Sequence, residues 1–174
     1  MTDGLMSLTY ENRPDITASE WQEVARLVPV LCGMARSGHS VLIKIDGYRD
    51  ASSRYTVVVN GGVDEHPLFR CDASSLPALL AEAVHACGLS DATVGEAGVD
   101  SELADALRLA DASVHDASFL AVYAEQSSHR PYFNLVYGES SGRKPSGPTL
   151  CVDGDDLASM LQGTCAKRSL PQVS

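Results

Sequence analysis

Two segments of the chain carry similar residue patterns in the same order, and this internal similarity constrains the fold more than any other feature. Residues 41–46 parallel residues 119–124, and residues 54–61 parallel residues 131–138, with one residue fewer in the second intervening loop. In each copy, two short stretches rich in apolar, β-branched or aromatic residues are separated by a loop, which predicts a β-hairpin. We therefore expect two hairpins.

A helix is expected on both sides of each hairpin. After the hairpins, residues 72–80 and 153–161 both begin with Asp and place apolar residues four, seven and eight positions later. Before the hairpins, helical patterns open near Ser19 and Ser101. An acidic residue followed by apolar residues at helical spacing is typical of a capped helix start.

These elements define the expected fold class. We predict a single domain, residues 1–174, built from two similar α-β-β-β-α units at about 17–88 and about 99–166. A mostly antiparallel sheet of up to six strands with helices packed on one face would bury every apolar stripe, which is an α+β fold. The other sheet face would then be a binding surface or the seam of a homodimer, and the strand register that decides its composition stays open.

Local signals place the ends of the helices in the first unit. Thr17, followed three residues later by Glu, forms a capping-box pattern, and apolar residues then recur at helical spacing until Gly38. Asp72 or Ser74 is expected to cap the next helix.

The two strands of the first hairpin differ in pattern. In residues 41–46, β-branched residues at 41, 43 and 45 alternate with Leu42, Lys44 and Asp46, as expected near a sheet edge, whereas residues 55–59 are continuously rich in β-branched types. We expect the first of these strands to lie nearer an edge and the second to lie inside the sheet.

Composition limits the class of protein. The longest nearly apolar run, residues 27–35, is too short for a membrane span and contains Pro29 and Gly33. A secretory signal pattern is not recognised, so we expect a cytoplasmic protein without a membrane segment. The five cysteines form no CxxC pair, which favours reduced thiols over a disulfide or zinc framework.

The net charge of −10 is concentrated in one part of the chain. Residues 64–116 contain eleven acidic residues and only Arg70 and Arg108 as cations. Binding to nucleic acid needs a basic surface, so we expect no nucleic-acid partner. A basic protein partner is favoured, although the same acids would also serve simply as a solvated surface.

No pattern in the sequence predicts a catalytic or metal site. The acids at 153, 155 and 156 resemble the start of a calcium loop but run into an apolar helix, so helix capping explains them better. No two histidines have the spacing that places both on one helix face as ligands. We expect no cofactor and no metal; a site assembled from His39, His66 or His129 and dispersed carboxylates is the remaining enzymatic alternative.

The candidate partner-binding residues are acids of the central region and basic or aromatic residues at the hairpin tips. Tyr and Arg are frequent contact residues at interfaces, but Arg at a turn is often only solvated. The set is Asp64, Glu65, Asp91, Glu96, Asp100, Glu102, Asp105, Tyr48, Arg49, Arg54, His129, Arg130 and Tyr132.

These features favour an acidic, cytoplasmic protein-binding module. Its concrete form would be an immunity protein, which neutralises a basic toxin or effector domain by direct binding, because acidic inhibitors of basic proteins associate through complementary charge. The alternatives are a small acidic secretion chaperone acting as a dimer, whose architecture is similar, and a small enzyme.

Overall fold

The computed structural model describes residues 15–61, 66–89, 100–114, 118–127, 130–141, 144–145 and 150–169. The first half contains α1 (Ala18–Cys32), η1 (Gly33–Ser37), β1 (Ser40–Asp46), η2 (Ala51–Ser53), β2 (Tyr55–Asn60), β3 (Pro67–Ala73) and α2 (Leu76–Ala86). The second half contains α4 (Ser101–Ser113), β4 (Ser118–Ser127), β5 (Arg130–Ser141), β6 (Lys144–Pro145), β7 (Leu150–Gly154) and α5 (Leu157–Ser169).

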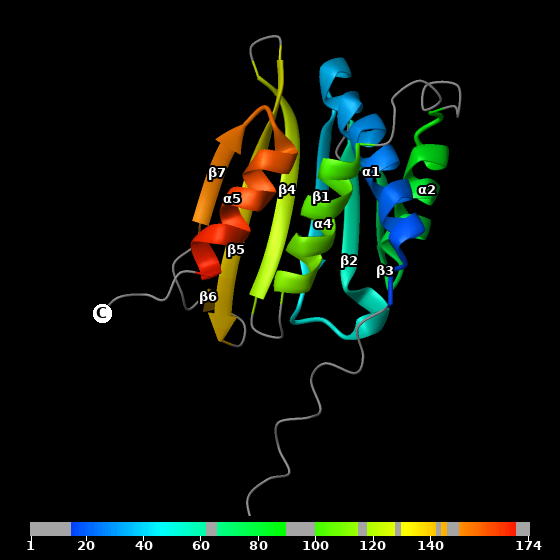
Figure 1. Cartoon of the computed structure of the whole chain (residues 1–174). Coiled ribbons are helices and arrows are strands. Elements are labelled where there is room, and N and C mark those ends of the chain that lie inside the picture. Colours follow the sequence, from blue (N-terminus) through cyan, green and yellow to red (C-terminus); the bar gives the residue numbers. More distant parts are fainter. Residues whose placement is uncertain are drawn as a thin grey trace, which may run out of the picture.

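The strands form one antiparallel sheet in the order β3-β2-β1-β4-β5-β7, and the two-residue β6 pairs with the end of β5. Helices α1, α2, α4 and α5 lie together on one face of this sheet (Figure 1). The predicted α+β class, with an antiparallel sheet and helices on one face, is confirmed. None of the helices in the described ranges is long and apolar enough to cross a bilayer.

The first strand is not near an edge. β1 pairs with β2 on one side and with β4 on the other, so it lies at the centre of the sheet. The prediction that this strand lies nearer an edge is wrong. Its alternating pattern indicates only that one face of the sheet is not covered by helices, and says nothing about how many strands pair with it. The partner that makes β1 central comes from a part of the chain that local patterning does not reveal.

Along the central strands, every second side chain is buried beneath the helices, so the two sets of side chains point to opposite faces of the sheet. Val41, Ile43 and Ile45 of β1 are buried beneath the helices, and the same holds for three residues on each of the adjacent strands: Tyr55, Val57 and Val59 of β2, and Leu120, Val122 and Ala124 of β4. The intervening side chains point to the other side of the sheet. We call that side the open face.

The residue-by-residue match between the two hairpins is wrong, because matched residues point to opposite faces of the sheet. Val41 points toward the helices, whereas its proposed counterpart Phe119 is on the open face and Leu120 is on the helix side. A shift of one residue exchanges the two faces of a strand, and matching apolar letters alone cannot detect it. That the two units form a repeat stays a prediction.

Local capping signals explain most of the helix ends. Glu20 and Thr17 make the reciprocal hydrogen bonds of a capping box at the start of α1. At α2 the N-cap is Ser75, whose hydroxyl accepts from the Ala78 N–H, so the expected caps Asp72 and Ser74 are wrong. Asp72 belongs to β3 instead. Of the three acids before α5, Asp156 is the one that accepts from a helix N–H, that of Ser159.

Candidate functional site

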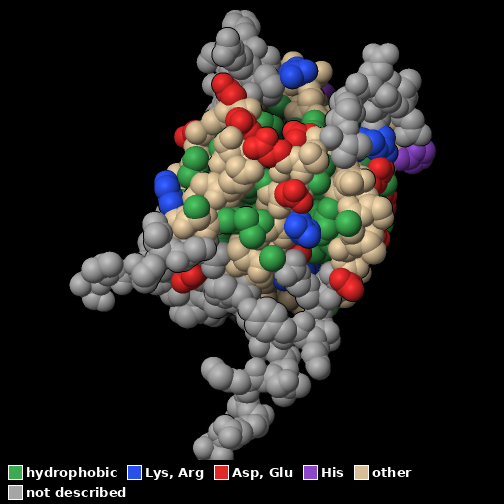
Figure 2. Space-filling view, viewed as in Figure 1, with side chains coloured by type: hydrophobic (Ala, Val, Ile, Leu, Met, Phe, Trp, Pro, Cys, Tyr) green, Lys and Arg blue, Asp and Glu red, His purple; other side chains and the backbone are tan. Residues whose placement is uncertain are grey.

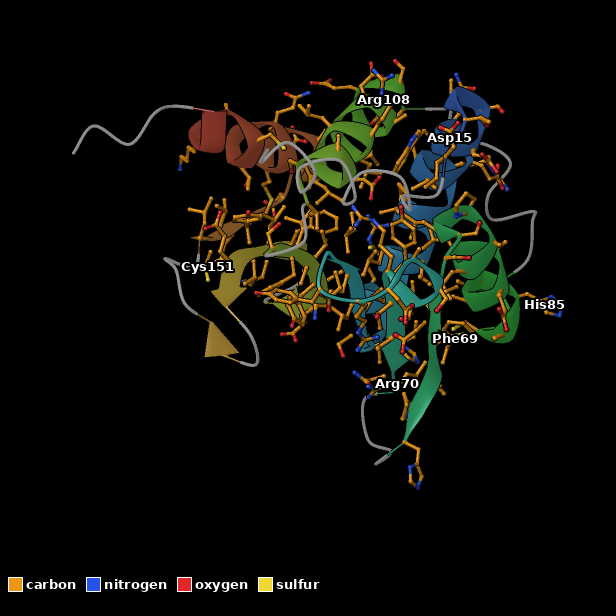
Figure 3. All side chains as sticks on the ribbon, turned by 90° about the horizontal axis from the view of Figure 1, so that it is seen from below. Asp15, Phe69, Arg70, His85, Arg108 and Cys151 are labelled. Atoms are coloured by element: carbon orange, nitrogen blue, oxygen red, sulfur yellow. The ribbon has the colours of Figure 1, made fainter. Side chains whose placement is uncertain are left out.

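The open face is crossed by a row of six side chains that the strand registers place side by side. Arg70 of β3 pairs with Val58, Val58 with Leu42, Leu42 with Tyr123, Tyr123 with Asn134, and Asn134 with Asp153 of β7. Figure 3 shows Arg70 on the side of β3 that faces away from the helices. The row therefore spans the sheet from one edge strand to the other.

The middle of this face is apolar. Leu42 and Val58 are half-buried, and the Tyr123 side chain is 37% exposed. Val136 and Ala121 lie in the neighbouring row, next to Lys44 and Cys151. The uncovered face of an antiparallel sheet is usually polar, so the apolar centre distinguishes this face from an ordinary solvated one.

A network of charged residues occupies one end of the open face in the first half of the sheet. Lys44 Nζ lies 2.7 Å from Asp46 Oδ2, and Arg49 Nη1 lies 2.9 Å from Asp72 Oδ1. The Thr56 hydroxyl donates to Asp72 Oδ1 at 2.5 Å. This hydrogen bond, together with the Arg49 guanidinium, lowers the pKa of the Asp72 carboxyl. The network explains why Arg49, a predicted contact residue, is held in place on the open face.

In the second half of the sheet, Phe119 lies at the same end of the open face as the charged network. Its ring lies against Gly138 on the neighbouring strand, where a Cβ atom would be only 2.6 Å from the ring. The Lys44 ammonium lies 5.1 Å from the ring centroid, within the range of a cation–π contact. A side chain at position 138 would therefore require this ring to move.

Arg54 has a structural environment that the sequence did not reveal. Its side chain is buried, and its guanidinium donates to the carboxylate and carbonyl of Asp111 and to the carbonyl of Val114. The Tyr55 hydroxyl donates to the same Asp111 carboxylate at 3.0 Å. These bonds join the start of β2 to the end of α4, so the binding surfaces proposed below do not include Arg54.

The helix layer presents a second surface, on α4. Glu102, Asp105 and Leu109 are exposed and follow one another at spacings of three and four residues, so they lie on one outward stripe of the helix. Leu109 is 51% exposed. We call these three residues the α4 stripe.

Further carboxylates surround the start of the α4 stripe. Asp100 caps α4 by accepting from the Leu103 N–H, and Gln162 of α5 donates to Glu102. Asp155 and Asp156 lie exposed at the start of α5, which packs against α4. Figure 2 shows acidic side chains gathered on the helix face near these helix ends.

The remaining predicted contact residues are placed as follows. Tyr48 is exposed beside the charged network, and its N–H donates to Asp46. Arg130 and Tyr132 belong to β5. Five predicted residues lie outside the part of the chain that the structure describes: Asp64, Glu65, Asp91, Glu96 and His129.

The histidines and cysteines do not converge on a site within the described ranges. His39 precedes β1 and His66 precedes β3, and no group of three or more His, Cys, Asp or Glu side chains there could hold a metal ion. A pocket of about 340 Å³ lies between α1 and α2, and its lining includes Glu23 and Arg26, which pair with each other. None of these features suggests a reaction.

Comparisons with protein-family models, with curated proteins and with solved structures find no match to this chain.

Proposed function

We propose that the protein is a non-enzymatic binding module that neutralises a basic protein partner, as an immunity protein does in the cytoplasm. The observation that carries the proposal is the α4 stripe, in which two exposed carboxylates lie in line with an exposed leucine. An apolar residue within a charged surface is a common arrangement at interfaces, since the apolar side chain supplies buried area and the charges supply orientation.

The charge of the surroundings supports a basic partner. The α4 stripe is adjacent to Asp100, Asp155 and Asp156, all exposed, and the whole chain carries a net charge of −10. The hydroxyl and N–H of Ser159 lower the pKa of Asp156, so this carboxylate stays ionised well into the acidic range. Such a field accelerates association with a cationic protein and repels nucleic acid.

The test is co-expression with the basic proteins encoded next to its gene, followed by measurement of the complex and of cell survival. We expect a one-to-one complex whose affinity falls with salt, and rescue of growth where the neighbour is toxic. The Glu102→Lys variant should weaken binding about tenfold, or about 1.4 kcal/mol, mostly through slower association. Glu82→Lys is the matched control, because Glu82 is an exposed glutamate on another helix, α2.

The same measurement separates this proposal from its alternatives. Equal affinity for the two variants would overturn the assignment of the α4 stripe, and a toxic neighbour that is neither bound nor neutralised would overturn the immunity role. A secretion chaperone would bind an extended, unfolded segment of its partner instead of the folded domain. An enzyme would show turnover that is lost on replacement of His39 or His66.

A further inference from the structure

We propose that the open face of the sheet binds a second copy of the same chain, with the two sheets stacked face to face about a two-fold axis. The axis runs parallel to the strands and passes between β1 and β4. This proposal concerns the side of the sheet opposite the α4 stripe, so it is independent of the function proposed above.

The distribution of charge on the open face favours a second copy as the occupant. In the first half of the sheet, Lys44, Arg49 and Arg70 outnumber the acids Asp46 and Asp72. Among the described open-face side chains of the second half, the charged residues are Glu125 on β4 and Asp153 on β7, both exposed. Among the described side chains of the open face, the first half therefore has one more cation than acid and the second half has two acids, so the two described halves are complementary in charge.

The strand register identifies which charges would meet. Arg70 and Asp153 are the two ends of the row that crosses the open face, with Leu42 and Tyr123 on the two central strands. A half-turn about an axis between these central strands exchanges the ends of the row. Arg70 of each copy is then placed over Asp153 of the other, and Leu42 is placed over Tyr123.

The twist of the sheet is compatible with this axis. A regularly twisted sheet has the shape of a saddle. A half-turn about the direction of its central strands leaves that shape unchanged. The distance between two sheets stacked in this way is therefore the same across the whole interface. A half-turn about the in-plane direction across the strands also preserves the saddle. That second axis would place the positive half over itself, and charge therefore selects the axis parallel to the strands.

The size of the face is adequate for a reversible dimer. Six strands about 4.8 Å apart, with about six residues each at about 3.3 Å per residue, present roughly 600 Å² per copy. Interfaces of standard size bury about 800 Å² per partner, and weaker ones bury less. The apolar centre formed by Leu42, Val58 and Tyr123 would be removed from water on both copies, which supplies the main driving force.

The experiment measures the oligomeric state of the full chain by sedimentation velocity over about a hundredfold range of concentration. We expect a monomer–dimer equilibrium that Tyr123→Asp shifts to the monomer. Leu109→Asp is the matched control, because it places the same charge at an exposed large apolar residue of the helix layer, and it should leave the dimer intact. A monomer at every concentration, or a dimer that Tyr123→Asp leaves unchanged, would overturn the proposal.

A charge exchange tests the axis without altering the apolar centre. Arg70→Asp and Asp153→Arg should each weaken the dimer at least about tenfold, and the double variant should restore most of the affinity. Both residues are exposed on edge strands, so these variants should fold even if Tyr123→Asp does not. If the double variant is no better than the singles, the proposed axis is wrong. Binding of the basic partner should survive all of these open-face variants, which separates failure of the dimer from failure of the proposed function.

Discussion

Arg54 and Asp111 illustrate what a buried ion pair does in this protein. The Asp111 side chain is 1% exposed and receives hydrogen bonds from both Arg54 and Tyr55. The pair joins the β-sheet to α4 from positions 57 residues apart. A carboxylate with so little access to water depends on its cation, because burial of an uncompensated charge is costly.

Removal of the cation should therefore destabilise the fold strongly. We expect Arg54→Met to lower the free energy of unfolding by about 3–5 kcal/mol, since it leaves Asp111 buried without Arg54. Arg108→Met removes the cation of an exposed pair with Asp105 and should cost less than about 1 kcal/mol. Urea denaturation measures both values, and similar losses for the two variants would contradict the role given to burial.

The cysteines should differ sharply in reactivity. Burial raises the pKa of the Cys32 thiol to about 12, whereas Cys151 is exposed on β7. The thiolate is the reactive form, so at concentrations where the chain is monomeric iodoacetamide should modify Cys151 in the native protein at least about a hundredfold faster than Cys32. Peptide mapping after brief alkylation measures the difference, and the same reaction in denaturant should abolish it. Comparable rates in the native protein would contradict the burial of Cys32.

The type of a residue predicts whether its side chain is exposed better than it predicts which other residue that side chain contacts. Glu102 and Asp105, two of the candidate contact residues, are exposed on α4, and their role in binding stays a prediction. The sequence places Arg54 among the basic and aromatic residues at the hairpin tips, and no local pattern reveals that its acceptor belongs to α4. The α4 stripe could have been found from the spacing of Glu102, Asp105 and Leu109 alone.

At the scale of elements, the packing of the β4–β5 hairpin depends on the absence of a side chain at Gly138. A methyl group at Gly138 would collide with the Phe119 ring, which would have to leave its place beside Lys44. We expect Gly138→Ala to destabilise the protein by about 1–3 kcal/mol, as overpacked substitutions do.

A glycine in α5 provides the opposite control. A Cβ at Gly163 would meet nothing within 4 Å, so Gly163→Ala should stabilise the protein by about 0.5–1 kcal/mol through helix propensity. Thermal unfolding measures both changes. A neutral or stabilising effect of Gly138→Ala would show that the Phe119 ring moves without cost.

The elements themselves were predictable where their signals are local. The capping box of α1 and the end of the following 3₁₀ helix η1 at Gly38, whose φ is 83°, follow from adjacent residues. The position of β1 in the sheet did not follow, because it depends on pairing with β4 across the two halves of the chain. For the same reason the open face could be expected from the sequence, but its row of side chains could not be identified.

At the scale of the whole molecule, the two halves share one core. β1 pairs with β4, and α1 packs against both α2 and α4. The buried side chains form a continuous cluster that includes Trp21 from the first half and Leu161 from the second. Such continuity predicts that neither half unfolds alone.

The expected result is a single cooperative transition in urea. Fluorescence of Trp21, the only tryptophan, reports on the first half, and alkylation of the buried Cys165 reports on α5 in the second. The two probes should give the same midpoint, and far-UV circular dichroism should agree with both. Two separate midpoints would show that the halves are independent domains.

The two outer strands described above also affect how the protein behaves when it is concentrated. β3 begins with Pro67, which has no backbone N–H to donate, and it carries the charged residues Arg70 and Asp72. β7 is only five residues long and carries Asp153. Short, charged or proline-containing borders resist the addition of foreign strands. Growth of the sheet sideways into fibrils is therefore disfavoured, and crowding should yield discrete assemblies instead of amyloid.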